Sequence, residues 1–322
     1  MLYDGANALS HSLPLTLLLP SVSYFFFLFI CVIWGASFIL MDRALQAMGP
    51  IAVGLGRLIG GSIVVGLYCL VTRKWARLSR SDWMHIGVVA VLANSLPFAM
   101  QPYVMAQADE HAYFGLMVAL VPIATILISI PMLSVHPTSR QLVGVLGGLA
   151  CMGLIVSDGQ QRGISTLHLL MALSVPVAYA IGNTYIKWKL DHVPTATLTL
   201  MTLLTGAAVL APLQWAPGAL EALGLSGPAE PQNVALAWSS LAVLSVLGTG
   251  VAILMFIHLI KTEGPLFAGM VTYVVPMMAL VWGGYDKEKL TTTEIVGVAG
   301  TLAMVALVQW RSATTVVDEV KV

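Results

Sequence analysis

Long apolar runs, separated by short polar connectors, fill most of the 322-residue chain. Each run is close to the ~20 residues that an α-helix needs to cross the hydrocarbon core of a bilayer. The longest connector, 214–233, is rich in Pro and Gly and is the one sizeable excursion into water that the pattern allows. The pattern predicts an all-α polytopic membrane protein with ten transmembrane helices near residues 22–42, 51–72, 84–106, 112–131, 139–157, 167–187, 194–213, 235–260, 265–283 and 292–310.

Composition supports lipid as the solvent of this chain. Hydrophobic residues make up 58% and charged residues only 9%, whereas soluble domains carry about 25% charged residues. The net charge of +0 gives no basic footprint, so we expect no nucleic acid partner. The three cysteines, Cys31, Cys69 and Cys151, lie in apolar runs and are interpreted as inert thiols.

The distribution of basic residues favours one orientation in the membrane. Residues 1–23 contain no Lys or Arg and are interpreted as an N-terminal tail, and 312–322 as a C-terminal tail. With both termini in the cytoplasm, most Lys and Arg residues of the connectors fall inside, led by the cluster in 73–80. We therefore predict a multi-pass protein of the plasma (inner) membrane with cytoplasmic termini.

The chain also repeats itself. Residues 33–50 align with 177–194, and 113–117 align with 267–271, which sets Pro122 on Pro276. Because each copy holds five spans, an odd number, the two copies must enter the membrane from opposite sides. An inverted repeat of this kind places a binding site between the halves and permits alternating access.

Several residues carry a family resemblance. The run Trp34-Gly35-Ala36-Ser37-Phe38 opens the first copy, and Gly297 follows Glu288-Lys289-Leu290-Thr291 in the second. With these motifs the chain resembles the EamA-type branch of the drug/metabolite transporter superfamily over residues 24–311. The resemblance implies two five-helix EamA-like repeats, 24–157 and 158–311, and the movement of small metabolites. The first copy departs from the pattern at 134–138, where the expected Glu is missing.

Arg57 is the most unusual residue of the predicted spans. It lies about seven residues, or roughly 10 Å, into the second span. An arginine at the centre of a membrane helix costs about 3 kcal/mol on insertion scales, so it should face the bundle interior or a wet cavity. Two roles stay open: a structural arginine paired with helix-end carbonyls or Asp42, and a residue that contacts the substrate.

Polar and aromatic residues at helical spacing are the other candidates for a cavity lining. Asn94 and Gln101 share a helix face with Pro97 and Met105. Interhelical hydrogen bonding is the alternative for such side chains, and we favour it for the stripe Thr195, Thr199 and Thr202. Trp34 has a second interpretation as an interfacial anchor. The full set of substrate-binding candidates is Trp34, Ser37, Arg57, Asn94, Gln101, Tyr179, Asn183 and Tyr273.

Pro122 and Pro276 are candidate hinges. A proline inside a helix removes one backbone hydrogen bond and kinks or loosens that turn. We expect the two prolines to let their helices bend alternately, each gating one mouth of the cavity. A static kink that only shapes packing is the alternative.

Missing motifs separate the classes of function. The sequence has no metalloprotease, nucleophile-elbow or ATP-binding motif, and every Asp and Glu lies near a span end or in a connector. We expect no enzyme activity, no cofactor and no metal site.

The favoured function is a secondary transporter that moves amino-acid-like or amphipathic solutes, with export favoured. The alternatives are a membrane enzyme, such as a lipid or acyl transferase, and a non-transporting scaffold. The expected partners are a small-molecule solute and the lipid bilayer, and a homodimer is not required.

Overall fold

The computed structural model describes residues 15–73, 75–108, 111–134, 138–161, 163–287 and 291–309. Every regular element in these ranges is helical. The first half of the chain holds α1 (Leu15–Gly35), α2 (Ser37–Leu45), α3 (Pro50–Thr72), α4 (Arg80–Val89), η1 (Ala90–Ser95), α5 (Leu96–Ala108), α6 (His111–Met117), η2 (Val118–Leu120), α7 (Val121–Leu133) and α8 (Ser139–Gln161). The second half holds α9 (Thr166–Lys189), α10 (Thr195–Gln214), α11 (Pro217–Ala222), α12 (Val234–Val243), η3 (Leu244–Val251), α13 (Ala252–Thr262), α14 (Pro265–Gly269), η4 (Met270–Tyr273), α15 (Val274–Tyr285) and α16 (Thr292–Gln309).

Eight helical stretches of the described residues are long and apolar enough to cross a membrane. They coincide with eight of the ten predicted spans and are Val22–Leu45, Pro50–Thr72, Arg80–Gln107, Tyr113–Leu133, Thr166–Lys189, Thr195–Gln214, Val234–Thr262 and Pro265–Tyr285. The other two predicted spans fall on α8 and α16, whose apolar parts are shorter, Leu142–Asp158 and Thr292–Met304. The chain is thus a multi-pass integral membrane protein by length and composition of its helices.

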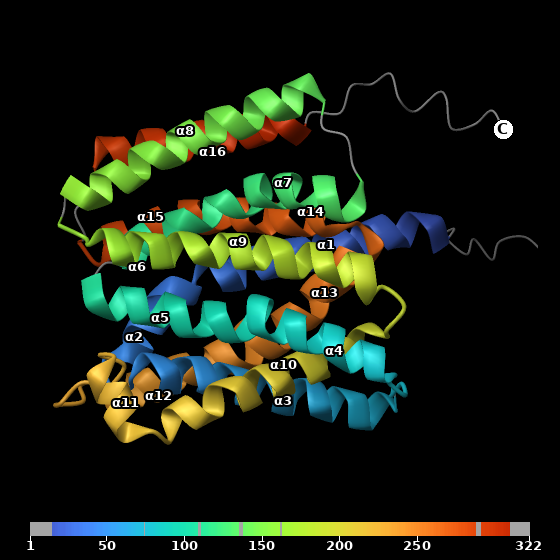
Figure 1. Cartoon of the computed structure of the whole chain (residues 1–322), viewed down its shortest axis with the longest axis horizontal. Helices are drawn as coiled ribbons and strands as arrows, with labels where there is room; N and C mark the ends of the chain where they lie inside the picture. Colours follow the sequence, from blue (N-terminus) through green and yellow to red (C-terminus); the bar gives the residue numbers. More distant parts are fainter. Residues whose placement is uncertain are drawn as a thin grey trace, which may run out of the picture.

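The long helices lie side by side in one bundle, and successive stretches run in alternate directions (Figure 1). The pair α8 and α16 packs together along one flank of the bundle (Figure 1). On the opposite flank α3 packs against α10 and η3. The helix α1 begins at Leu15, so the last part of the predicted tail 1–23 is helical, while residues 1–14 lie outside the described ranges.

Four of the long stretches are interrupted by non-α turns. The segments η1 and η3 are π-helices, and η2 and η4 are 3-10 helices. Pro97, the second residue of α5, has no N–H for the carbonyl of Ala93 in η1, which explains a loosened turn there. In η1 the N–H of Leu96 bonds to the carbonyl of Val91, five residues back, as in a π-helix. Such π turns occur frequently at functional sites.

Glycines set the closest helix contacts around α3. A Cβ atom at Gly54 would lie 2.2 Å from the carbonyl oxygen of Phe98 in α5. At Gly60 and Gly61 a Cβ would lie 2.5 Å from Ser245 and 2.7 Å from Thr249, both in η3. This agrees with the close helix approach that small residues permit in membrane bundles. The backbone of α3 therefore packs closely against the backbone of α5 at Phe98 and against the side chains of Ser245 and Thr249 in η3.

Polar contacts tie the helix ends together. At one end of the bundle Arg43 of α2 pairs with Asp42, at 2.9 Å, and with Asp286 after α15, at 2.5 Å. The connector 215–233 lies at this same end, where Asn233 Nδ2 donates to Gln46 Oε1 at 3.0 Å (Figure 1). At the other end Lys187 Nζ donates to the carbonyl oxygen of Lys261 at 2.7 Å.

Candidate functional site

A cavity lies among the helices. The space free of protein atoms in it is about 820 Å³, including the part that is open to solvent. In the first half its walls come from α1, α2, α3, α4, η1, α5, η2 and α7, and in the second half from α9, α10, η3, α13, η4 and α15. The described residues of α8 and α16 do not line it. Both halves of the chain thus contribute residues to one cavity.

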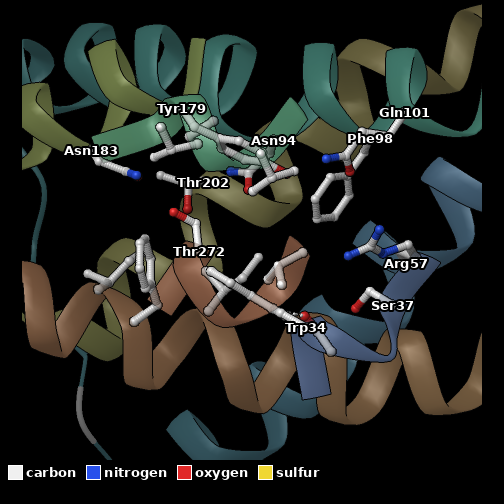
Figure 2. Close-up of a pocket in the computed structure, with 18 of the residues that line it drawn as sticks. Trp34, Ser37, Arg57, Asn94, Phe98, Gln101, Tyr179, Asn183, Thr202 and Thr272 are labelled. Carbon is white, nitrogen blue, oxygen red and sulfur yellow. Dashed lines mark hydrogen bonds between the residues drawn. The ribbon is translucent and has the colours of Figure 1, made fainter. Parts of the chain in front are cut away.

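Seven of the predicted binding candidates meet in this cavity. Figure 2 shows them from facing helices, with two groups at opposite ends of the view. Tyr273 lies in η4, but its side chain is outside the described residues. The candidates that line the cavity are Trp34, Ser37, Arg57, Asn94, Gln101, Tyr179 and Asn183.

Arg57 is buried, with an exposed fraction of 4%, and its guanidinium points toward the cavity (Figure 2). Its Nε donates to Thr249 Oγ1 at 3.3 Å, and its Nη1 lies 3.3 Å from Met41 Sδ. The guanidinium carbon sits 4.1 Å above the centre of the Phe98 ring. The cation is thus held by neutral partners and by a cation–π contact. The proposed pairing with Asp42 is not what the structure shows, because Asp42 pairs with Arg43.

Trp34 is fixed at the cavity wall by two contacts. Its Nε1 donates to the carbonyl oxygen of Gly248 in η3 at 2.9 Å. Its ring lies 4.8 Å from the ring of Phe256, measured between centroids. Trp34 is half-buried, and the π-helix supplies a carbonyl that satisfies its indole N–H. These contacts join the first span to the eighth.

Four polar side chains of the lining make no hydrogen bond to another described residue: Asn94, Gln101, Tyr179 and Asn183. Asn94 and Asn183 are only 3% and 5% exposed. Buried polar groups nearly always have a partner, from protein, water or ligand. The donors and acceptors of these side chains are therefore available to a solute in the cavity.

The lining also contains hydroxyls that bond within their own helices. Ser37 donates to the carbonyl of Ile33 at 3.1 Å, and Thr202 to that of Thr199 at 3.0 Å. Such hydroxyls still offer their lone pairs to the cavity. For Thr202 we favoured interhelical hydrogen bonding, but its hydroxyl bonds within its own helix and the residue lines the cavity. Phe98 and Thr272 were not among the predicted candidates. Their residue types occur equally on packing faces, so spacing alone gives no signal for them.

The candidate hinge prolines each follow a 3-10 segment. Pro122 lies at the start of α7, directly after η2, and Pro276 lies near the start of α15, after η4. Both are buried, and the residues before them, Val121 and Val275, line the cavity. Each proline therefore marks a discontinuity in a helix next to the cavity.

Within the described residues, His, Cys, Asp and Glu side chains do not come together in a group of three or more that could hold a metal ion. Of the described residues that line the cavity, Arg57 is the one that carries a charge. The lining otherwise consists of apolar, aromatic, amide and hydroxyl groups. This chemistry suits binding of an amphipathic small molecule.

Curated proteins that are similar to this chain are named as transporters. An uncharacterized transporter of Synechocystis is 26% identical over 303 residues, covering 87% of this chain and 87% of the relative. One of Bacillus subtilis is 23% identical over 291 residues, covering 88% of this chain and 90% of the relative. One of Archaeoglobus fulgidus is 23% identical over 260 residues and covers 79% and 85% of the two chains.

A solved crystal structure has the same fold. It aligns with 90% of this chain and 96% of its own chain at a TM-score of 0.64, with 17% sequence identity. The EamA-like transporter family matches the chain twice, over residues 21–157 and again over 166–310. The chain therefore belongs to the EamA-like transporter family and is a multi-pass membrane transporter.

Proposed function

We propose that this protein is a secondary transporter that carries small metabolites across the plasma membrane by alternating access. The observation that carries the proposal is the shared cavity. Residues of the first matched segment, such as Arg57 and Asn94, face residues of the second, such as Tyr179 and Asn183. A site between two homologous halves is the place where rocking of one half against the other exposes a solute to either side.

The proposed topology has ten transmembrane helices in two inverted five-helix repeats, 24–157 and 158–311, with short tails at both ends. The eight apolar stretches support it, together with α8 and α16 as the fifth and tenth helices. The positions of the two π-helices add support. The alignment that sets 113–117 on 267–271 also sets Ala90, the start of η1, on Leu244, the start of η3.

The proposed orientation puts both termini in the cytoplasm. The start of α1, the connector 73–79 and the end of α16 lie at the same end of the bundle (Figure 1). That connector belongs to the most basic region of the chain, and basic connectors favour the cytoplasmic side. The connector 215–233 would then face the outside, and the favoured direction of flux is export.

The proposed gates are the helix discontinuities at Pro122 and Pro276. Under inverted symmetry, one lies toward each side of the membrane. Bending at each would open one mouth of the cavity while the other stays closed.

The proposed solutes are amino-acid-like or amphipathic, because the lining combines aromatic and amide groups with Arg57. Coupling is either absent or uses an acid at a span boundary, such as Glu263, which accepts a hydrogen bond from Ser23 at 2.7 Å.

Cysteine accessibility tests the topology. In a background without Cys31, Cys69 and Cys151, Ala76→Cys and Ala222→Cys should react with a membrane-impermeant maleimide from opposite sides of the membrane. Labelling of both from one side would overturn the inverted arrangement.

Flux into reconstituted vesicles tests transport. Comparison of metabolites in cells that overexpress the protein with those in cells that lack it would select the solutes. Saturable, protein-dependent uptake of a selected solute is expected. Chemical conversion of the solute by detergent-solubilised protein, without uptake, would favour the membrane enzyme. The absence of both uptake and conversion would favour a scaffold.

A further inference from the structure

Among the described residues, the cavity lining carries one positive charge and no negative one. Arg57 is more than nine-tenths buried, and its partners in the described part of the chain are the neutral Thr249, Met41 and Phe98. A buried charge without a counterion is unfavourable, because the low local dielectric weakens its solvation. A membrane protein keeps such a residue mainly where it contributes to a ligand or ion pathway.

Four of the uncharged polar side chains lie away from this cation, while Ser37 and Gln101 lie on its side of the cavity (Figure 2). Figure 2 shows Arg57 with Ser37, Phe98 and Gln101 at one end of the cavity. Asn94, Tyr179, Asn183 and Thr202 lie toward the other end, and the indole of Trp34 lies along the wall between the groups (Figure 2). The cavity thus has a cationic end, an aromatic middle and an end that offers neutral hydrogen-bonding groups.

We propose that the transported solute is an amphipathic monocarboxylate without an ammonium group, which narrows the solute class of the proposed function and rests on it. Its carboxylate binds the Arg57 guanidinium, whose planar fork suits two parallel hydrogen bonds. An aromatic or aliphatic body lies along Trp34 and Phe98. An uncharged hydroxyl or amide at the far end bonds to Asn94 or Asn183.

Charge balance distinguishes monocarboxylates from zwitterionic amino acids and from phosphate esters as solutes for this cavity. A zwitterionic amino acid is neutral overall, so it leaves the net charge of the site at +1 and brings its ammonium close to the guanidinium. Like charges at short distance in a low dielectric repel strongly. A phosphate ester with two negative charges overcompensates a single arginine. A monocarboxylate, with a single negative charge, makes the occupied site neutral, and its two oxygens suit the planar fork of the guanidinium.

Three probes that share one skeleton test the proposal: 3-(4-hydroxyphenyl)propanoate, tyrosine and tyramine. They have the same ring, hydroxyl and chain, and differ only in their charged groups. Binding to the full-length protein in nanodiscs at pH 7.5 should be at least 10-fold tighter for the propanoate than for tyrosine or tyramine. Equal or tighter binding of tyrosine or tyramine, or no saturable binding of the propanoate, would overturn the proposal.

Variants assign the effect to Arg57. Arg57→Gln should weaken propanoate binding by at least 10-fold and leave binding of the neutral 3-(4-hydroxyphenyl)propan-1-ol within 2-fold. Arg57→Lys should recover part of the loss, because a point charge does not replace the planar fork. The matched control is Arg77→Gln, which removes an exposed arginine outside the cavity. A purely structural Arg57 would instead weaken both probes equally and lower the unfolding temperature.

Uptake into proteoliposomes separates this proposal from the transport proposal. Uptake of tyrosine but not of the propanoate would leave a transporter and refute the monocarboxylate class. Tight, Arg57-dependent binding of the propanoate without protein-dependent uptake would support the site and refute transport.

Discussion

The packing of α3 against α5 gives a sharp test of the structure through one methyl group. Gly54 faces the carbonyl oxygen of Phe98, and a Cβ atom there would lie 2.2 Å away, where ordinary contact needs at least 3.4 Å. The Gly54→Ala variant must therefore push α3 and α5 apart. Overpacking of this kind costs about 1–3 kcal/mol. Because Phe98 carries the ring beneath Arg57, the separation should also weaken solute binding.

The same substitution on the same helix supplies the control. A Cβ at Gly66 would lie 3.8 Å from its nearest neighbour, Leu200, which is ordinary contact. Gly66→Ala should stabilise the protein by roughly 0.5–1 kcal/mol, because alanine loses less backbone entropy than glycine in a helix. The two variants should therefore differ by about 1.5–4 kcal/mol in unfolding free energy.

Thermal unfolding in detergent, followed by tryptophan fluorescence, measures the order of stability. We expect Gly66→Ala to unfold at or above the wild-type temperature and Gly54→Ala clearly below it. If Gly54→Ala matched Gly66→Ala, the close approach of α3 to Phe98 would be wrong, and with it the placement of the ring beside Arg57.

The hinge prolines and two contacts give further predictions. Pro122→Ala and Pro276→Ala should each slow exchange in proteoliposomes while equilibrium binding stays nearly intact, and should bias cavity accessibility to opposite sides; wild-type exchange rates in both would refute the hinge. Asp286→Asn should lower the unfolding temperature, because it removes the partner of Arg43 across two helices. The swap Arg43→Asp with Asp286→Arg should recover part of that loss, and no difference between the single and double variants would argue against the pair. Trp34→Phe keeps the ring but loses the hydrogen bond to the η3 carbonyl, so it should cost about 1 kcal/mol in chemical unfolding. Unchanged stability would show that water replaces the indole N–H.

Much of the fold followed from composition, because the physical constraint is severe. A chain with 9% charged residues must place its apolar runs in lipid, and lipid demands helices of nearly fixed length. The prediction was weakest at helix interruptions. The break between α1 and α2 at Ala36 and the π turns depend on tertiary packing, which periodicity does not contain.

The cavity was predictable in part for a related reason. Asn94, Gln101 and Asn183 are polar residues inside apolar spans, and lipid excludes them, so they had to face protein or water. Phe98 gave no such signal, because an aromatic ring suits lipid, core and cavity alike. The expected stripe on the third span also included Met105, which packs in the hydrophobic core instead. Gln101 and Met105 lie one turn apart in α5, so a shared helix face does not ensure that both residues reach the cavity.

The paired π-helices bear on the ancestry of the chain. A π turn holds one residue more than the α turn it replaces. Ala90 and Leu244 begin these turns, and the alignment that sets 113–117 on 267–271 also sets these two residues on each other. Such a coincidence is most simply explained if an ancestral five-helix unit already carried the extra residue when its gene was duplicated. Deleting that residue today would rotate the rest of the helix by about 100°. The extra residue would then be older than the duplication. Both copies would have to keep it, since the positions of Gln101 and Phe256 in the cavity depend on the helix rotation that the extra residue introduces.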